Sequence, residues 1–527
     1  MNFRSSGKNF IGFDLSAEGN VLFQSFDPAE QELNPTVFYQ ATEDEVDRAC
    51  SLAQIAFEKL QRIDRFQRAD FLARIADEIM DLGDTLIQMF RKESGLTESR
   101  AIIERTRTVY QLRSFAELVR QGQWVEASID TGDQDRQPPK PDLRKMHVGI
   151  GPVAVFGASN FPLAYSTAGG DTAAAFAAGC PVIVKAHPMH AGTGALVSEA
   201  IIRAAKVSDM PNGIFSNLNA QNFDVGRQLV LNPAIKAVGF TGSVHGGRAL
   251  FDLAASRPEP IPVFAEMGST NPIVVLPSAL EAGLEKWTTA IADSIISGTG
   301  QYCTSPGMIF LQKSFESNQF VDRLAEKLMV HHAGIMLHPD IQNRFETEKK
   351  TMLEFSDRFY EKEKAQGVVG RQALMVLSAN GFIENEALHH EVFGPFAMVI
   401  LCQDRSGLQA AISVLKGQLT GTILGSEYEI KRNMELVEIL KQRVGRIIFN
   451  GVPTGVEVCP SMNHGGPYPA STDSRYSAVG TDSVRRFVRP VVFQNCPQEI
   501  LPVELRNKNH LGIIRRINGT HSSEDVN

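Results

Sequence analysis

Residues 236–247 read Lys-Ala-Val-Gly-Phe-Thr-Gly-Ser-Val-His-Gly-Gly, an apolar run that passes through a glycine-rich turn into a helix-compatible segment. Similar apolar runs, separated by helix-compatible segments, occupy residues 153–156, 181–184, 214–218 and 263–265. This alternation predicts βαβ units and a doubly wound parallel sheet. A second alternation runs from residues 271–276 through 396–401 to 445–449. We therefore expect an α/β protein with two such domains and an active site where they meet.

The N-terminal part of the chain is helical in pattern. Thr42 and Glu45 have the spacing of a capping box, and Asp64 can cap a second helix. A third helix is expected from about residue 100 to 120. Residues 131–143 are rich in Asp, Gln, Pro and Lys, which predicts an exposed excursion from the domain.

The 527-residue chain has an ordinary globular composition, with 43% hydrophobic and 21% charged residues. Its net charge of -8 and isoelectric point near 5.9 disfavour a nucleic-acid or anionic membrane partner. Apolar runs of membrane-spanning length and an N-terminal secretion signal are not found. The six cysteines lack CxxC spacing, which argues against disulfides and a metal site. These features predict a cytoplasmic protein that acts on a small molecule.

The glycine-rich turn in residues 239–247 is a candidate phosphate-binding site. Glycines let the backbone approach a phosphate, and a helix N-terminus offers free N–H groups. Many such turns only pack a helix onto a sheet, but this one follows a strand in a βαβ series. It is neither a GxGxxG fingerprint nor a Walker sequence, so phosphoryl transfer is disfavoured.

Four polar residues lie where chemistry is expected. Cys303 falls in a glycine-flanked connection, residues 297–304, although a free cysteine is most often a buried hydrophobe. Glu266 ends a strand and is a candidate general base. Asn160 follows the first strand and could stabilise an oxyanion or simply cap a helix. Lys185 ends another strand, where a solvent-directed lysine is the alternative.

The order of these motifs resembles the aldehyde dehydrogenase superfamily over nearly the whole chain. The matching positions are, in order, Asn160, Lys185, Gly242-Ser243, Glu266, Cys303 and Glu391-Val-Phe-Gly-Pro395. Loops after Asn160, around Cys303 and at residues 451–458 and 464–469 resemble the branch that oxidises α-ketoglutarate semialdehyde (2,5-dioxopentanoate). Close relatives in that branch are NADP-dependent fatty aldehyde dehydrogenases.

The resemblance implies a role for each matching residue. Cys303 would be the nucleophile that forms a thiohemiacetal and then a thioester. Asn160 would stabilise the oxyanion, and Glu266 would activate water for hydrolysis. The residues expected to bind the cofactor are Ser159, Lys185, His187, Gly242, Ser243, Gly247, Glu391 and Phe393.

Substrate contacts are expected from loops and from the helix at residues 100–120, which carries Arg105, Arg107 and Arg113. A substrate carboxylate needs a cation, whereas an alkyl chain would be penalised by one. The alternative for each arginine is a solvated helix face. The substrate-binding residues we expect are Phe161, Arg105, Arg113, Tyr302 and Thr304.

One departure from the family pattern bears on the cofactor. Where many members have Lys-Pro-Ser-Glu, this chain has Lys185-Ala-His187-Pro188, so the carboxylate that would repel a 2′-phosphate is missing. We therefore expect NADP or NAD, with NADP slightly favoured. The family's Glu-Leu-Gly-Gly reads Glu266-Met-Gly-Ser269, which leaves the base in place.

The resemblance also implies a domain organisation. The fold class is α/β and aldehyde dehydrogenase-like, with a dinucleotide-binding domain in residues 1–130 and 147–267 and a catalytic domain in residues 268–480. Residues 131–146 and 481–502 would pair in a small β-flap that makes a homodimer or homotetramer. Residues 503–527 would form a tail that is frayed after about Gly519.

The predicted function is NAD(P)-dependent oxidation of α-ketoglutarate semialdehyde to α-ketoglutarate. Oxidation of medium- or long-chain fatty aldehydes is the alternative within the family. A catalytically silent binding protein is the alternative of another class, and the joint presence of Cys303, Glu266 and Asn160 argues against it.

Overall fold

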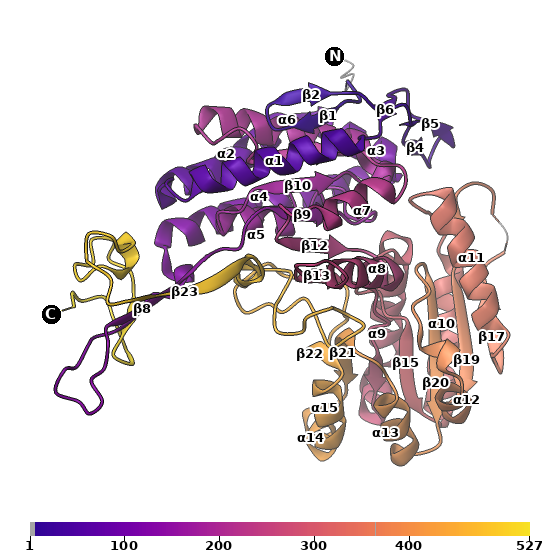
Figure 1. Cartoon of the computed structure of the whole chain (residues 1–527). Helices are drawn as coiled ribbons and strands as arrows, with labels where there is room; N and C mark the ends of the chain where they lie inside the picture. Colours follow the sequence, from indigo (N-terminus) through magenta and orange to yellow (C-terminus); the bar gives the residue numbers. More distant parts are fainter. Residues whose placement is uncertain (1–5, 364, 527) are drawn as a thin grey trace.

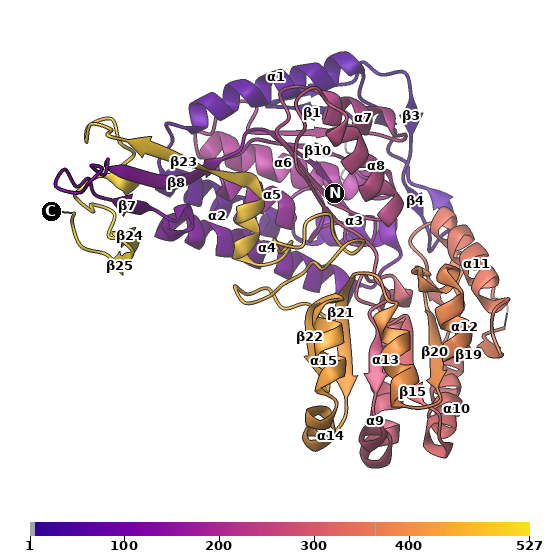
Figure 2. The same cartoon turned by 60° about the horizontal axis from the view of Figure 1, so that its bottom comes forward.

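The computed structural model describes residues 6–363 and 365–526 and is built around two seven-stranded sheets and one five-stranded sheet (Figures 1 and 2). Residues 1–5 and 527, which the predicted domain bounds include, lie outside the described residues. The two larger sheets lie in separate layers of helices, and the five-stranded sheet projects to one side of the molecule.

The first sheet has the strand order β13, β12, β9, β10, β11, β1, β2. The five strands from β13 to β11 run parallel, which confirms the predicted βαβ series. The antiparallel edge strands β1 and β2 were not predicted, because three-residue strands give no readable alternation. The bounds are β1 Asn9–Ile11, β2 Asp14–Ser16, β9 Val153–Phe156, β10 Val182–Lys185, β11 Phe215–Leu218, β12 Ala237–Thr241 and β13 Val263–Glu266.

Helices cover both faces of this sheet, because alternate residues of its strands enter two different apolar clusters. The capping box at Thr42 and Glu45 and the cap at Asp64 are confirmed by their hydrogen bonds to backbone N–H groups. The helices are α1 Glu43–Leu60, α2 Arg65–Asp81, α3 Gly83–Ser94, α4 Glu98–Gln121, α5 Gly170–Ala177, α6 Ala191–Val207, α7 Asp224–Leu231 and α8 Val244–Ala255.

The second sheet has the order β17, β19, β20, β15, β14, β21, β22, and every pairing except that of β17 is parallel. Its strands are β14 Ile273–Val275, β15 Met308–Gln312, β17 Arg358–Glu361, β19 Ala373–Ser378, β20 Phe396–Cys402, β21 Gln418–Leu424 and β22 Val444–Phe449. Its helices are α9 Pro277–Ile296, α10 Phe315–Val330, α11 Pro339–Leu353, α12 Ala379–Glu384, α13 Arg405–Ser413, α14 Glu427–Arg432 and α15 Met434–Lys441.

The third sheet has the order β23, β8, β7, β24, β25. β23 (Val488–Gln494) pairs with β8 (Leu143–Gly149), so the two segments expected to form a flap do meet. The expectation of a frayed tail is wrong. β24 (Arg515–Ile517) and β25 (Thr520–Ser522) pair with each other, and β24 extends the sheet beside β7 (Ser128–Asp130).

Three short strand pairs complete the described structure: β3 Leu22–Phe23 with β6 Phe38–Tyr39, β4 Phe26–Asp27 with β5 Glu32–Leu33, and β16 Gly334–Ile335 with β18 Val369–Gly370. Among the residues that the structure describes, none of the helices combines the length and apolar character needed to cross a bilayer.

The buried Arg515 should hold the C-terminal tail in place. Its guanidinium donates to the carbonyl of Arg506, to that of Asn507 at 3.2 Å and to that of Glu524 at 2.9 Å. Because charged hydrogen bonds are worth about 2 kcal/mol each, Arg515→Ala should lower the unfolding midpoint and speed amide exchange in β24 and β25. His521→Ala, at an exposed position of β25, is the control. Unchanged exchange in Arg515→Ala would contradict the role.

Candidate active site

A cavity of about 190 Å³ contains all three predicted catalytic residues and most of the predicted cofactor residues. Glu266 is the last residue of β13, Asn160 follows β9, and Cys303 follows the short 3-10 helix at Ser297–Gly300. The carboxyl ends of parallel strands meet at one edge of a sheet, which brings Asn160 and Glu266 together. Cys303 comes to the same place from the turn before β15 of the second sheet. The predicted residues that line the cavity are Ser159, Asn160, Gly242, Ser243, Glu266, Cys303, Glu391 and Phe393.

A hydrogen-bonded chain joins the thiol to the carboxylate through a histidine that sequence reasoning did not assign. His464 Nε2 lies 3.4 Å from Cys303 Sγ, and His464 Nδ1 lies 3.2 Å from Glu266 Oε2. Glu266 and His464 are buried, whereas Cys303 is partly exposed. A thiol, an imidazole and a carboxylate in this order form the arrangement that activates a cysteine nucleophile.

The charges around Cys303, His464 and Glu266 favour a protonated, positively charged His464 imidazole beside the sulfur. Burial lowers the pKa of His464, but attraction to Tyr165 and Cys303 and hydrogen bonds to Cys303 and Glu266 outweigh it, so the pKa is raised well above its ordinary value. The pKa of Glu266 is raised overall. Burial raises it by more than the hydrogen bond from His464 lowers it. The carboxyl group is therefore poised to exchange a proton closer to neutral pH than an exposed glutamate.

Hydrogen bonds from the Asn271 side chain fix the loop that carries Cys303. This fully buried side chain donates to the Cys303 carbonyl at 2.8 Å and to the Ser305 carbonyl at 2.9 Å. Its own oxygen accepts from Ser269 at 3.1 Å and from Thr420 at 2.9 Å. The Asn271 backbone has φ 44°, a left-handed conformation that Asn tolerates better than most residues. Asn271 therefore sets the direction of the backbone around Cys303.

Asn160 lies against the same loop. Its Nδ2 donates to the Gln301 carbonyl at 2.8 Å, which leaves its second N–H for a ligand. The Asn160 carbonyl accepts from Arg100 at 3.2 Å. Both ends of the residue are thus held, as preorganised oxyanion stabilisation requires.

The cofactor face of the cavity fits a dinucleotide. Ser243 caps α8 by accepting from Gly246 N at 3.2 Å, and Gly242 and Ser243 at this helix start line the cavity, where a helix N-terminus favours a phosphate. A Cβ on Gly268 would lie 2.1 Å from Glu391 Oε2, so only glycine leaves room beside this carboxylate. Within the described residues the Lys185 ammonium has no ion pair or hydrogen bond, and burial lowers its pKa to about 8.

Two predicted cofactor residues have packing contacts instead. Gly247 packs α8 onto the sheet, since a Cβ there would lie 2.5 Å from Met267 Sδ. It is therefore withdrawn as a cofactor contact. The His187 ring stacks on His190 with centroids 5.1 Å apart, and its Nδ1 accepts from Met189 N. Burial lowers the pKa of His187 well below its ordinary value, so the imidazole is neutral in this structure.

Three aromatic rings, one of them from Tyr302 next to Cys303 in the sequence, form a wall. Phe161 lies 5.0 Å from Tyr165 and 5.6 Å from Tyr302, centroid to centroid. The predicted substrate residues Phe161 and Tyr302 thus belong to one surface, and Thr304 is buried. Arg100 lies over the Phe161 ring at 4.4 Å and donates to the Tyr302 hydroxyl.

The predicted arginines Arg105 and Arg113 do not reach this wall. Arg105 donates to the Gly83 carbonyl, and Arg113 pairs with Asp77 on the surface. The helical period turns these positions away from the face of α4 that carries Arg100 and Arg107. We therefore withdraw Arg105 and Arg113 as substrate contacts.

The signals for the residues missed from the sequence were weak. His464 stands alone between Asn463 and two glycines, a context that exposes a side chain to a site but does not name its partner. Asn271 precedes Pro272 and looked like an ordinary strand start. Neither residue has a spacing rule that links it to Cys303, because the fold, not local sequence, brings them together.

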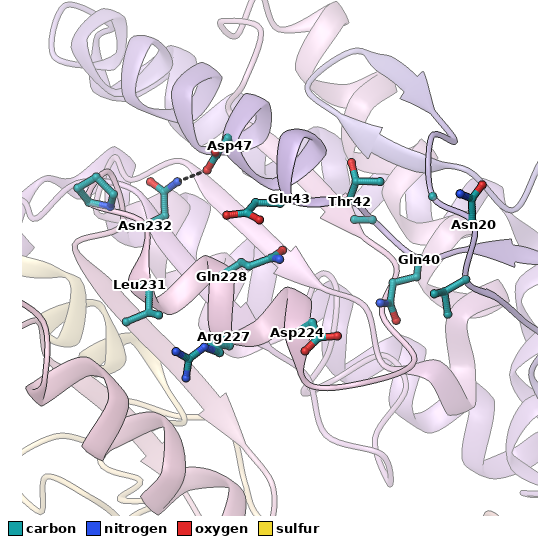
Figure 3. A pocket seen from close by; sticks show the side chains of 14 residues that line it. Asn20, Gln40, Thr42, Glu43, Asp47, Asp224, Arg227, Gln228, Leu231 and Asn232 are labelled. Carbon is teal, nitrogen blue, oxygen red and sulfur yellow. Dashed lines mark hydrogen bonds between the residues drawn. The ribbon is translucent and has the colours of Figure 1, made fainter.

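A separate hollow of about 700 Å³ lies between α1 and α7 (Figure 3). Polar side chains such as Glu43, Asp47 and Asp224 line it, and Asp47 accepts from Asn232 at 2.8 Å. It contains neither a cysteine nor a histidine and is lined by none of the residues of the Cys303 cavity. The chemistry therefore belongs to the smaller cavity.

Comparison with known proteins agrees with this geometry. A model of the aldehyde dehydrogenase family matches residues 15–489, and the chain belongs to this family. It is thus an NAD(P)-dependent aldehyde dehydrogenase by class.

Two curated relatives are similar over almost their full length. Alpha-ketoglutaric semialdehyde dehydrogenase 2 of Azospirillum brasilense is 42% identical, with 98% of this chain and 99% of the relative covered. Alpha-ketoglutaric semialdehyde dehydrogenase of Acinetobacter baylyi is 43% identical, with 98% of each covered. Among solved structures, a gamma-glutamyl-gamma-aminobutyraldehyde dehydrogenase from Burkholderia cenocepacia has a TM-score of 0.80 at 17% identity, covering 93% of this chain and 97% of that one, which confirms the fold.

Asn271→Asp tests whether the loop anchor matters for chemistry. The change replaces an N–H donor with an oxygen that repels the carbonyls of Cys303 and Ser305, so the thiol should shift. We expect kcat to fall about 100-fold while nucleotide affinity stays within about twofold. Stopped-flow turnover and nucleotide titration measure the two. Asn318→Asp, the same change at an exposed position of α10, should be silent. An unaffected kcat in Asn271→Asp would remove the positioning role.

Proposed function

We propose that this protein oxidises α-ketoglutarate semialdehyde to α-ketoglutarate with NAD(P) as hydride acceptor. The observation that carries the proposal is the chain from Cys303 through His464 to Glu266, which opens onto a cavity suited to a dinucleotide. The names of the two relatives at 42% and 43% identity support the substrate.

The first stage is acylation of the cysteine. His464 accepts the thiol proton, and the Cys303 sulfur attacks the aldehyde carbon to form a thiohemiacetal. The second N–H of Asn160 and the backbone N–H of Cys303 stabilise the oxyanion. NAD(P), held by Lys185, Glu391 and the start of α8, would supply the hydride acceptor, and Cys303 would then carry the acyl group as a thioester.

The second stage is hydrolysis of the thioester. Glu266 takes a proton from water, which attacks the acyl carbon, and the Cys303 thiolate leaves. His464 holds the Glu266 carboxylate in place at 3.2 Å and returns a proton to the sulfur. Glu266 then releases its proton to solvent, so each turnover consumes one water and yields the carboxylic acid, the free thiol and one proton.

The nucleotide would be held by the α8 N-terminus, Lys185 and Glu391. Within this proposal NADP is slightly favoured over NAD, because no carboxylate follows Lys185 where a 2′-phosphate would lie. The packed, uncharged His187 does not add to this preference.

We further propose that the molecule forms a homodimer or homotetramer through β23. This strand is the edge of the five-stranded sheet, and Val492 on it is exposed. Unpaired strand edges readily join another chain. All six cysteines are free thiols, which supports a reducing compartment such as the cytoplasm.

A substrate panel tests the proposal. Purified protein with NADP or NAD should reduce the nucleotide fastest, by kcat/KM, with α-ketoglutarate semialdehyde, followed by succinate semialdehyde and then decanal. Cys303→Ala should bind nucleotide but show no turnover. Decanal as the best substrate would replace the proposed activity with fatty aldehyde oxidation. No reduction with any aldehyde would support the silent binding protein.

Glu266→Gln and His464→Gln should fail at different stages. Glu266→Gln should keep the initial burst of reduced nucleotide and lose steady turnover by about 100-fold or more, since only hydrolysis needs the base. His464→Gln should slow the burst itself. In the native protein kcat should fall as pH drops through the raised pKa of Glu266, above the ordinary value of about 4.3, and Glu266→Gln should lose this dependence. A burst equally slow in both variants would contradict the division of roles.

A further inference from the structure

Two arginines lie near the aromatic wall beside Cys303 without a carboxylate partner. Among residues 6–363 and 365–526, neither Arg107 nor Arg446 forms an ion pair. Both are partly buried. An arginine that has lost solvent without gaining an anion costs free energy, so a charged ligand that restores the pairing is favoured.

Arg107 reaches the wall from α4. Its Nη2 donates to the Tyr165 hydroxyl at 2.8 Å, and its guanidinium lies 5.4 Å from the Tyr165 ring centroid. The Tyr165 ring is in turn 6.0 Å from that of His464, the residue that contacts the Cys303 sulfur. Arg107 Nε is buried and has no hydrogen-bond partner. A short chain of contacts therefore leads from the nucleophile to an incompletely paired cation.

Arg446 reaches the same region from β22. Its Nη2 donates to the Pro453 carbonyl at 2.8 Å and its Nη1 to the Gly455 carbonyl at 3.2 Å. Arg107 Nη1 donates to the next residue, Val456, at 2.7 Å. Burial lowers the pKa of Arg446, whereas attraction to Cys303 and Tyr165 raises it. Arg446 is therefore close enough to both groups to interact with them electrostatically. The two guanidinium groups thus converge on residues 453–456.

The remaining arginine at the wall is already neutralised. Arg100 pairs with Glu104 at 3.0 Å, and Glu104 also accepts from the N–H groups of Leu163 and Ala164. Arg100 therefore fixes the loop that carries Asn160. Its charge is not available to a substrate.

We propose that Arg107 and Arg446 form the site that binds the substrate carboxylate at the end opposite the aldehyde. The inference rests on the proposed oxidation of a five-carbon semialdehyde and adds the residues that select it. The carbonyl contacts of both arginines leave other N–H groups of each guanidinium free for an anion. The site would exclude an alkyl chain, because burying two unpaired cations against methylene groups is unfavourable. The alternative is that Arg107 and Arg446 only anchor the loop at residues 453–456 and do not contact the substrate.

Matched substrates separate recognition from structure. For Arg107→Gln and Arg446→Gln, kcat/KM for α-ketoglutarate semialdehyde should fall at least about tenfold each, mainly through KM, while that for pentanal should fall far less. Arg446→Lys, which keeps the charge but not the planar fork, should recover part of the loss. Arg105→Gln and Arg113→Gln on the same helix should behave like the native protein. An equal fall with both aldehydes would overturn the proposal in favour of loop anchoring.

Glutarate provides a test that does not depend on semialdehyde turnover. As a five-carbon dicarboxylate it should inhibit pentanal oxidation competitively in the native protein and in Arg105→Gln, and at least about tenfold more weakly in Arg107→Gln and Arg446→Gln. Equal inhibition in all variants would overturn the arginine site, even if the protein does oxidise α-ketoglutarate semialdehyde. If no aldehyde is oxidised, the proposed function fails, and calorimetric titration of glutarate against the same variants still decides the site.

Discussion

The hydrogen bonds from His464 to Cys303 and to Glu266 are the contacts on which the site depends. They join three segments that are far apart in the sequence: the end of β13, the turn after the 3-10 helix at Ser297–Gly300, and the loop between β22 and the 3-10 helix at Thr481–Phe487. Each sheet contributes a strand end or a loop to the meeting point. The two α/β halves must therefore pack in one arrangement for the thiol, the imidazole and the carboxylate to be within reach of one another.

A buried ion pair ties the third sheet to this centre. Arg486 lies in the 3-10 helix at Thr481–Phe487, directly before β23, and donates to Asp171 of α5 at 2.7 Å. Both charges act on the pKa of Glu266, since Arg486 lowers it and Asp171 raises it. Removal of either partner would leave a buried charge unpaired, which is strongly destabilising. The segment that carries the edge strand β23 is thus fixed near Glu266.

Much of this arrangement could be predicted from the sequence, because parallel strands, helix caps and motif order are local signals. The strands at residues 153–156 and 263–265, the capping box at Thr42, and the nearness of Cys303 to Glu266 follow from them. His464 could not be predicted, because its role arises only from packing across the fold. The arginines of α4 are a second example. The helical period of 3.6 residues predicts that Arg105 and Arg107 point in different directions, but only the packed structure shows that Arg107 faces the aromatic wall. The paired C-terminal tail was missed because its strands are three residues long.

The central claim is that Cys303 carries the substrate as a thioester. The most direct measurement is mass spectrometry of Glu266→Gln protein after brief reaction with α-ketoglutarate semialdehyde and NADP. The account predicts that the peptide containing Cys303 gains the mass of the acyl group, and that the gain requires NADP. An unmodified Cys303 peptide during nucleotide reduction, or an acyl group on another cysteine, would contradict it.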